Sequence, residues 1–368
     1  MARKRRGRGE GSIFQRADGV WVASASGGYR ANGRRVRKTA YGKTKREAQD
    51  KLRKLLDTAT TEDINRLTVA QVVDEWLTAK KRTVAPTTYR SYSDTAATYV
   101  KPHVGHHRAV ELKPAHVHRF YADMERNGET TGNQRKAGGI LFSVMRYAVK
   151  QRLIEYNPCA DIGRPKPEKK EMRVLTPEQT DVLLTAAGDD PLRALYVLAI
   201  ASGMRSGELF GLEWRDIDFD AHCVSVRRTL EELSGQLRVK PPKSAKGIRR
   251  IDLPQFAMDA LHVHRKAALA AGRLNAPVFC DAKGGYLRRP NVARRSFYPL
   301  LEKADVPKIR FHDLRHTAAT LLLLQGVNPK VVSERLGHAS VEITLNTYSH
   351  VLPTLQRDAA DKLDQLFA

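Results

Sequence analysis

Two arginines, Arg205 and Arg315, and a pair of histidines, His312 and His316, lie in the second half of this 368-residue chain. Together they have the chemistry of a phosphate-binding site. Arg205 lies in the string SGMRSGEL, and His312 and Arg315 lie in the string HDLRHT. A guanidinium group is planar, permanently charged and matched to two nonbridging oxygens of a phosphate. Because His312 and Arg315 are three residues apart, they share one helical face and can address one ligand. These residues predict a site that stabilises the extra negative charge of a phosphate under attack.

Glu208 follows Arg205 by three residues. On a helix this spacing places both side chains on one face, so we expect a salt bridge that holds the guanidinium in place. The alternative interpretation is an ordinary ion pair at the start of a helix, without a functional role.

A metal site is the main alternative for the histidine pair. His312 and His316 have the i, i+4 spacing of metal ligands on a helix. However, no glutamate stands where a metalloprotease helix would carry its base, and no acidic cluster offers ligands for Mg²⁺. Arg315 between the two histidines is a poor neighbour for a cation and a good one for phosphate. The sequence therefore favours a site without a metal or another cofactor.

The last unit, predicted over residues 166–368, must position these side chains. A buried helix is predicted over 192–201, ended by Ser202-Gly203, which places Arg205 in the turn that follows. Short strands are predicted at 223–227 and 248–253. Helices are predicted at 312–325, 328–336 and 340–348, so this unit has a mixed α+β pattern.

Two smaller units are predicted before it. Residues 1–62 contain three short strand patterns, followed by a helix whose capping box is formed by Thr44 and Glu47. Residues 63–165 are helical, and their first helix starts at Thr68 with Gln71 closing its capping box. The predicted fold class is therefore multidomain and mainly α, with small β-sheets.

The chain is strongly basic, with a formal net charge of +24. Residues 1–60 alone hold 17 lysines and arginines against 5 acidic residues. Such a surface neutralises phosphates and releases their counterions, so nucleic acid is the expected partner. The three cysteines form no CxxC pair, no apolar run is long enough to cross a membrane, and no apolar segment follows the basic start. We expect a cytoplasmic protein.

Three further strings carry a resemblance to a known family. They are PPKSAKGIRRI with Lys243, LGHAS with His338 and NTYSH with Tyr348, the last two with their key residues ten positions apart. Together with the strings of Arg205 and Arg315, and in this order, they resemble the tyrosine recombinases, the family of phage and conjugative-transposon integrases. Ser206 stands where a second arginine is frequent in the family, and Ser244 where threonine is common.

The resemblance implies a role for each matching residue. Tyr348 would be the nucleophile that forms a 3′-phosphotyrosyl link. Arg205, His312 and Arg315 would stabilise the transition state, with His338 assisting. Lys243 would protonate the leaving 5′ oxygen, and Lys246 is the alternative for this role.

The resemblance also implies the architecture and the partners. Residues 1–62 would be an arm-type DNA-binding domain, 63–165 a helical core-binding (SAM-like) domain and 166–368 the catalytic domain with its C-terminal tail. The partners would be double-stranded DNA attachment sites, a homotetramer on DNA, and DNA-bending or directionality helper proteins. The function would be the integration and excision of a phage or mobile element in a bacterial cell.

Two other functions fit parts of the pattern. A type IB topoisomerase-like enzyme would use the same active-site residues to relax DNA, although an arm-like first unit has no use there. A non-catalytic DNA-binding regulator of recombination would bind DNA but form no covalent adduct.

Overall fold

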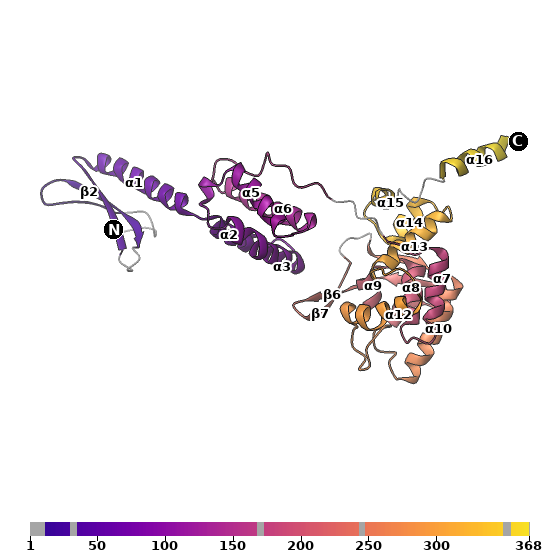
Figure 1. Ribbon diagram of the computed structural model, residues 1–368. Helices are drawn as coiled ribbons and strands as arrows, with labels where there is room; N and C mark the ends of the chain where they lie inside the picture. The colour runs from indigo at the N-terminus through magenta and orange to yellow at the C-terminus, as the bar shows by residue number, and fades with distance from the viewer. Residues whose placement is uncertain (1–11, 30–34, 168–172, 243–246, 349–354, 368) are drawn as a thin grey trace. The chain divides into compact units, whose positions relative to one another are not determined.

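The structure is a computed structural model that describes residues 12–29, 35–167, 173–242, 247–348 and 355–367 (Figure 1). The chain divides into two compact units, Met1–Lys169 and Lys170–Ala368. The predicted division into three domains remains a prediction; helix α1 continues to Arg66, past the predicted boundary after residue 62.

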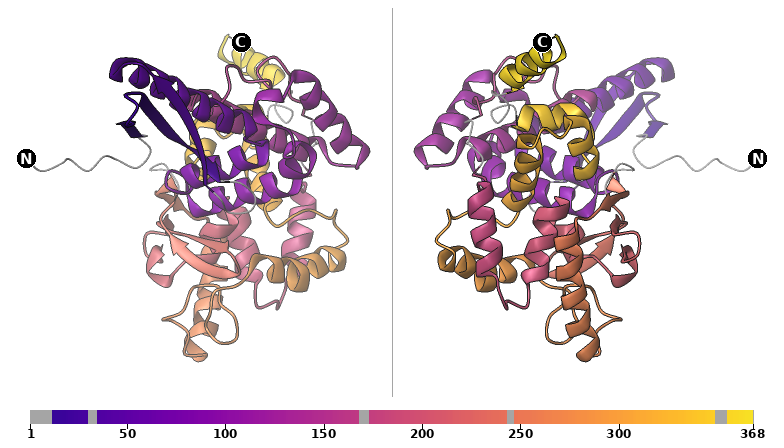
Figure 2. Two further views of the ribbon diagram at one scale, coloured as in Figure 1. Left: turned by 90° about the vertical axis from the view of Figure 1, so that its left-hand side faces the viewer. Right: turned by 90° about the vertical axis from the view of Figure 1, so that its right-hand side faces the viewer.

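A three-stranded antiparallel sheet begins the first unit, as the sequence predicted. Its strands, in spatial order, are β1 (Ser12–Gln15), β2 (Trp21–Tyr29) and β3 (Arg35–Gly42). The long helix α1 (Lys45–Arg66) lies along the sheet (Figure 2) and buries Ala48 and Leu52 against Ala23. The predicted cap is present, because the Thr44 hydroxyl accepts a hydrogen bond from the Glu47 amide. The predicted Asn32-Gly33 turn lies outside the described residues.

A helical bundle completes the first unit around a core that contains Trp76 and Met145. The predicted capping box of Thr68 and Gln71 is present at the start of its first helix. Its elements are α2 (Val69–Lys81), α3 (Pro86–Thr95), the π-helical η1 (Ala96–Val100), α4 (Lys101–Val104), the 3₁₀ turn η2 (Ala109–Glu111), α5 (Pro114–Arg126) and α6 (Thr131–Lys150).

The second unit is a larger helical assembly with two small sheets. The buried helix α8 packs against α7, α10 and α13, because almost every side chain from Ala194 to Ile200 is apolar and buried. Its helical elements are α7 (Pro177–Ala186), α8 (Arg193–Ser202), α9 (Ser206–Phe210), η3 (Trp214–Asp216), α10 (Gln255–Ala270), α11 (Arg289–Val292), η5 (Ala293–Phe297), α12 (Tyr298–Lys303), α13 (Asp313–Leu324), α14 (Pro329–Leu336), α15 (Val341–Tyr348) and α16 (Leu355–Phe367).

The strands of the second unit form two separate sheets. One has the order β4 (Ile217–Asp218), β5 (Cys223–Val226) and β8 (Arg249–Asp252), and all its pairs are antiparallel. The other is a hairpin of β6 (Thr229–Leu233) and β7 (Gln236–Lys240), which the sequence analysis did not predict. Its turn uses Ser234 and Gly235, both with positive φ.

The predicted fold class is confirmed, since the chain is mainly helical with small sheets and begins with a three-stranded one. Within the described residues, no helix combines the length and the apolar character needed to cross a bilayer.

Candidate active site

The turn between α8 and α9 places Arg205. Helix α8 ends in Gly203, whose φ of 63° is the left-handed conformation that glycine adopts without strain. The Ser202 hydroxyl accepts a bond from the Met204 amide and so fixes the turn. Arg205 is the residue before the first turn of α9, and its side chain remains 41% exposed. The guanidinium is therefore both anchored and accessible.

Close approach of α9 to the β6–β7 hairpin requires Gly207. A Cβ at this position would lie 2.5 Å from Thr229 Oγ1 and 2.7 Å from the Leu230 carbonyl oxygen. No larger residue fits there without a shift of the backbone. Helix α9, and with it Arg205, is thus set directly against the hairpin.

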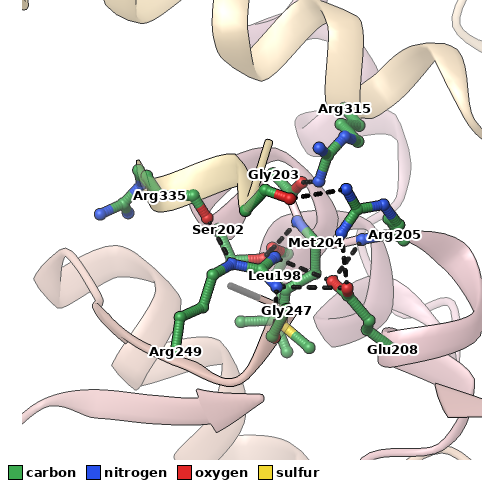
Figure 3. A network of polar contacts seen from close by, with 11 residues as sticks. Leu198, Ser202, Gly203, Met204, Arg205, Glu208, Gly247, Arg249, Arg315 and Arg335 are labelled. Atoms are coloured by element: carbon green, nitrogen blue, oxygen red, sulfur yellow. Dashed lines mark hydrogen bonds and ion pairs between the residues drawn. The ribbon is translucent and has the colours of Figure 1, made fainter. Parts of the chain in front are cut away.

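Glu208 holds two guanidinium groups at once (Figure 3). Arg205 Nη1 donates to Glu208 Oε1 at 2.9 Å, so the predicted salt bridge is confirmed. Arg249, on β8, pairs with both carboxylate oxygens, Nη1 at 3.2 Å and Nη2 at 2.8 Å. Burial favours the protonated acid, but the hydrogen bonds from Arg249 and Arg205 outweigh it and lower the pKa of Glu208. The carboxylate is charged at neutral pH.

The same two arginines fix the turn that carries His338. Arg205 Nη2 donates to the Gly337 carbonyl at 2.8 Å, and Arg249 Nε donates to the Arg335 carbonyl at 2.7 Å. Gly337 ends α14 with a positive φ of 66°. Arg335 in turn donates to the Ala201 carbonyl at the end of α8. Segments far apart in the sequence are therefore tied together beside Arg205 (Figure 3).

Arg315 is the second predicted arginine, and it is almost fully buried on α13. Its Nη1 donates to the Gly203 carbonyl at 2.8 Å, directly beside the turn of Arg205. Burial and the positive charge of Arg205 lower the pKa of Arg315 to about 9, so it remains protonated at pH 7. Two cations are thus held close together, an arrangement that an anion bound between them would stabilise.

His338 and His312 are both neutral in this environment. His338 Nδ1 bonds with the buried Thr344 hydroxyl at 2.8 Å. Partial dehydration, followed by the positive charges of Arg315 and Arg205, lowers the pKa of His338 to about 4. His312 precedes α13, and dehydration together with His316 and Arg315 lowers its pKa to about 4 as well.

Tyr348, at the end of α15, is fully buried. Its ring packs in a small apolar cluster with Leu323 and Leu336. Burial raises the pKa of Tyr348 to about 12, although Arg315 acts in the opposite direction. Its hydroxyl lies 2.8 Å from His316 Nδ1.

Lys243 and its alternative Lys246 lie outside the described residues. The segment that contains them connects β7, which ends at Lys240, with β8, which starts at Arg249. Since Arg249 bonds with Glu208, the end of this segment is attached to the partner of Arg205.

The structure therefore brings together five of the six predicted residues: Arg205, His312, Arg315, His338 and Tyr348. It adds Arg249, which the sequence analysis did not single out. Arg249 lies in the string of Lys243, but an arginine on a short strand looks like any solvated cation until tertiary contacts are known. The sequence analysis named His316 only as a member of the histidine pair and as a ligand in the alternative interpretation of a metal site, and the structure makes it the hydrogen-bond partner of Tyr348.

The chemistry available at this site is phosphate chemistry. Two permanently charged guanidinium groups, neutral imidazoles and a phenol are what an anionic, tetrahedral group under attack requires. Within the described residues, no cluster of three or more histidine, cysteine or acidic side chains has the geometry of a metal site. Fold and site together define a class of protein whose site has the chemistry to act on a phosphate group.

Comparison with known proteins gives the family. The model of the phage integrase family matches residues 173–354, and that of the phage integrase central domain matches residues 69–164. A protein named tyrosine recombinase XerC-like from Caldanaerobacter subterraneus subsp. tengcongensis is 30% identical to this chain. The alignment covers 91% of this chain and 93% of the relative. The ICEBs1 integrase of Bacillus subtilis is 29% identical and covers 68% of this chain and 71% of its own length. The chain belongs to the phage integrase family of tyrosine recombinases and is an enzyme of site-specific DNA recombination.

Solved structures share the fold. The Tn1549 transposon integrase, in complex with a circular intermediate DNA, aligns with a TM-score of 0.71 at 21% identity and covers 81% of this chain and 99% of its own. A lambda integrase tetramer bound to a Holliday junction aligns with a TM-score of 0.60 at 17% identity, covering 89% and 95%. At these identities the likeness establishes the fold.

Proposed function

We propose that this integrase cuts and rejoins double-stranded DNA at attachment sites of a phage or mobile element, with Tyr348 as the nucleophile. Its partners are the DNA sites and three further copies of the chain, assembled as a tetramer, together with helper proteins that bend DNA or set direction. Residues 1–62 bind arm sites, 63–165 bind core sites and 166–368 carry the chemistry.

In the cleavage step, Tyr348 Oη forms a bond to the scissile phosphorus, and the bond between phosphorus and the 5′ oxygen breaks. The product is a 3′-phosphotyrosyl link and a free 5′ hydroxyl, whose proton comes from Lys243. Arg205, Arg315 and His312 stabilise the charge on the pentacoordinate phosphate, and His338 assists. Because the phosphotyrosyl link stores the energy of the broken phosphoester bond, rejoining needs no nucleotide cofactor.

The observation that carries the proposal is a pair of neighbouring arginines, one of which, Arg315, acts on a buried tyrosine. Arg315 bonds to Gly203 beside the turn of Arg205, and its charge acts on the Tyr348 hydroxyl. Glu208 and the Gly337 carbonyl hold Arg205 at the same place. A phosphate that bridges the two guanidinium groups is therefore brought toward the hydroxyl.

A covalent-capture selection tests the proposal. A pool of nicked duplexes with randomised inverted repeats is incubated with the protein in EDTA, and protein–DNA adducts that survive denaturation are isolated and sequenced. We expect adducts on 3′ phosphates of a defined sequence. Tyr348→Phe should form none and still bind the selected duplex, whereas Tyr298→Phe, a matched change in the same unit, should keep full cleavage.

Other outcomes decide between the alternatives. Tight binding of the duplex pool without recovery of any adduct would indicate a non-catalytic regulator. Adducts without Holliday junctions between two selected sites would indicate a DNA relaxer. Cleavage that requires a divalent metal, or that persists in Tyr348→Phe, would overturn the mechanism.

A further inference from the structure

The Tyr348 hydroxyl has an imidazole as its partner, and this imidazole is not one of the two predicted site histidines. His316 Nδ1 lies 2.8 Å from Tyr348 Oη, and the two rings are 5.9 Å apart between centroids. His316 follows Arg315 directly on α13, so one turn of helix carries both a phosphate ligand and the neighbour of the hydroxyl.

A buried phenol needs a proton acceptor in contact with it. Tyr348 is 0% exposed, so bulk water does not reach its hydroxyl in this arrangement. Burial also keeps the hydroxyl protonated, because it raises the pKa of Tyr348 to about 12. A neutral phenol is a weak nucleophile, and attack on phosphorus requires that the proton leaves as the new bond forms.

Among the described residues, the other charged or basic groups of the site have no hydrogen bond with the Tyr348 hydroxyl. His338 uses Nδ1 to bond with Thr344, and Arg315 donates to Gly203 and has no lone pair to accept a proton. His312 packs edge-on against His316 at 5.3 Å between ring centroids. Among the described residues, His316 is the side chain that forms a hydrogen bond with the Tyr348 hydroxyl.

We propose that His316 is the general base that takes the proton of Tyr348 during DNA cleavage and returns it during rejoining. This inference rests on the proposed function, in which Tyr348 is the nucleophile. As the bond from Oη to phosphorus forms, the phenolic proton moves to Nδ1, while the 5′ oxygen leaves with a proton from Lys243. The reverse step uses the same two transfers, so no proton is gained or lost over a complete strand exchange.

The environment of His316 suits this role. Burial lowers the pKa of His316, with Arg315 and Arg310 acting in the same direction and Asp313 against them. The ring is therefore neutral at pH 7 and able to accept a proton. His312 and Arg315, the residues proposed to stabilise the phosphate, lie four positions and one position before His316, so the acceptor belongs to the same turn of the chain.

The test is single-turnover cleavage of the duplex obtained by covalent capture. His316→Asn keeps a hydrogen-bonding group near the position of Nδ1 but cannot take a proton, and we expect cleavage to be slower by about 100-fold or more. In His316→Ala, added imidazole should restore part of the rate. DNA affinity of both variants should remain that of the parent protein. Thermal unfolding should be little changed in His316→Asn, whereas His316→Ala leaves the buried hydroxyl without its partner and should unfold at a lower temperature.

Replacement of Tyr348 by 3,5-difluorotyrosine, whose phenol is more acidic, distinguishes a base from other roles. In the His316→Asn background, this replacement should raise the cleavage rate by at least about tenfold, because a more acidic nucleophile depends less on its base. It should recover little in His312→Asn, since that residue is proposed to act on the phosphate.

Each alternative result is distinguishable. If the parent protein forms adducts and His316→Asn cleaves at the parental rate, His316 is not the base while the proposed function stands. If His316→Asn is active and His316→Ala is not, the residue only positions the hydroxyl, and the base assignment fails. If the parent protein forms no adduct, the proposed function fails and this inference fails with it.

Discussion

Glu208 carries its negative charge in an almost completely buried position, with 3% of its side chain exposed. Two arginines compensate that charge, Arg205 from the same turn and Arg249 from β8. The carboxylate therefore does more than pair with a helix-start arginine: it sets the distance between the segment of Arg205 and the strand that follows Lys243. Its removal would leave Arg249, whose side chain is 8% exposed, as a buried charge without its partner.

We expect Glu208→Gln to destabilise the second unit by about 3 kcal/mol, since breaking one partner of a buried pair leaves an uncompensated charge. This loss of stability corresponds to amide hydrogen exchange that is about 100-fold faster in the affected segments. Hydrogen–deuterium exchange of amides in α9 and β8 measures it. The matched control is Asp252→Asn on β8, whose pair with Arg250 is exposed and contributes less than about 1 kcal/mol. Equal effects of the two substitutions would contradict the buried-pair interpretation.

His312 and His338 give the second unit an acid-sensitive stability. The folded state lowers both pKa values from the usual 6.5 to about 4. A lowered histidine pKa means that the unfolded chain binds protons first, so stability is full above pH 6.5 and is lost as pH falls toward 4. We expect the thermal midpoint of residues 170–368 to fall between pH 6.5 and 4.5, and to fall less in His338→Asn. The same pH dependence in both proteins would exclude His338 as a contributor.

The sequence predicted the contacts of these residues only where the two partners lie close together in the chain. Arg205 with Glu208, and His312 with Arg315, are pairs three residues apart, and spacing alone predicted that they share a face. The partnership of Glu208 with Arg249 spans 41 positions, and that of His316 with Tyr348 spans 32. No periodicity predicts such pairs, because they depend on how α13, α15 and β8 pack.

Among the elements, the helices followed the prediction most closely. The capping boxes at Thr44 and Thr68 are local patterns and are present as predicted, and the glycine stop at Gly203 is in the predicted place. The β6–β7 hairpin was missed although QLRVK alternates polar and apolar residues, because TLEEL has two adjacent glutamates that break the same alternation in the first strand. Its position is set by contact with α9 rather than by its own burial.

Two neighbouring glycines of α6 offer a matched test of helix packing in the first unit. A Cβ at Gly138 would lie 1.9 Å from Tyr121 Oη and 2.7 Å from its Cζ, whereas the nearest atom to a Cβ at Gly139 is 3.8 Å away. We expect Gly139→Ala to stabilise the unit by about 1 kcal/mol through helix propensity. Gly138→Ala should instead destabilise it by about 1–3 kcal/mol, because the Tyr121 ring must leave its place.

Thermal unfolding of the full chain, with exchange of α6 amides to locate the effect, measures both changes. Similar gains in the two variants would show that Tyr121 moves without loss and would contradict the packing described for α5 and α6.

At the scale of the whole molecule, composition predicted more than pattern did. The net charge of +24 indicated a nucleic-acid partner before any motif was considered. The relation between Met1–Lys169 and Lys170–Ala368 could not be predicted in the same way, because it depends on a segment rich in lysine, proline and glutamate that carries little apolar surface.

The charge distribution leads to a prediction about DNA affinity. Residues 1–66 hold 18 lysines and arginines against 7 acidic residues, close to half of the net charge. If this part contacts DNA as proposed, each phosphate that it neutralises adds about 0.9 to the slope of log affinity against log salt concentration. A chain that starts at Leu67 should therefore bind a non-specific duplex more weakly at 50 mM salt and show a clearly shallower slope, as measured by fluorescence anisotropy over a salt series.

Tyr348→Phe provides the control for this measurement, because it removes an uncharged hydroxyl and should leave the slope of the full chain unchanged. A shortened chain with the parental slope would mean that the cations of residues 1–66 do not contact phosphates. The arm-type role of the first residues would then be wrong, while cleavage by the second unit would be unaffected. The salt series thus tests the function of the N-terminal sheet and helix independently of the chemistry at Tyr348.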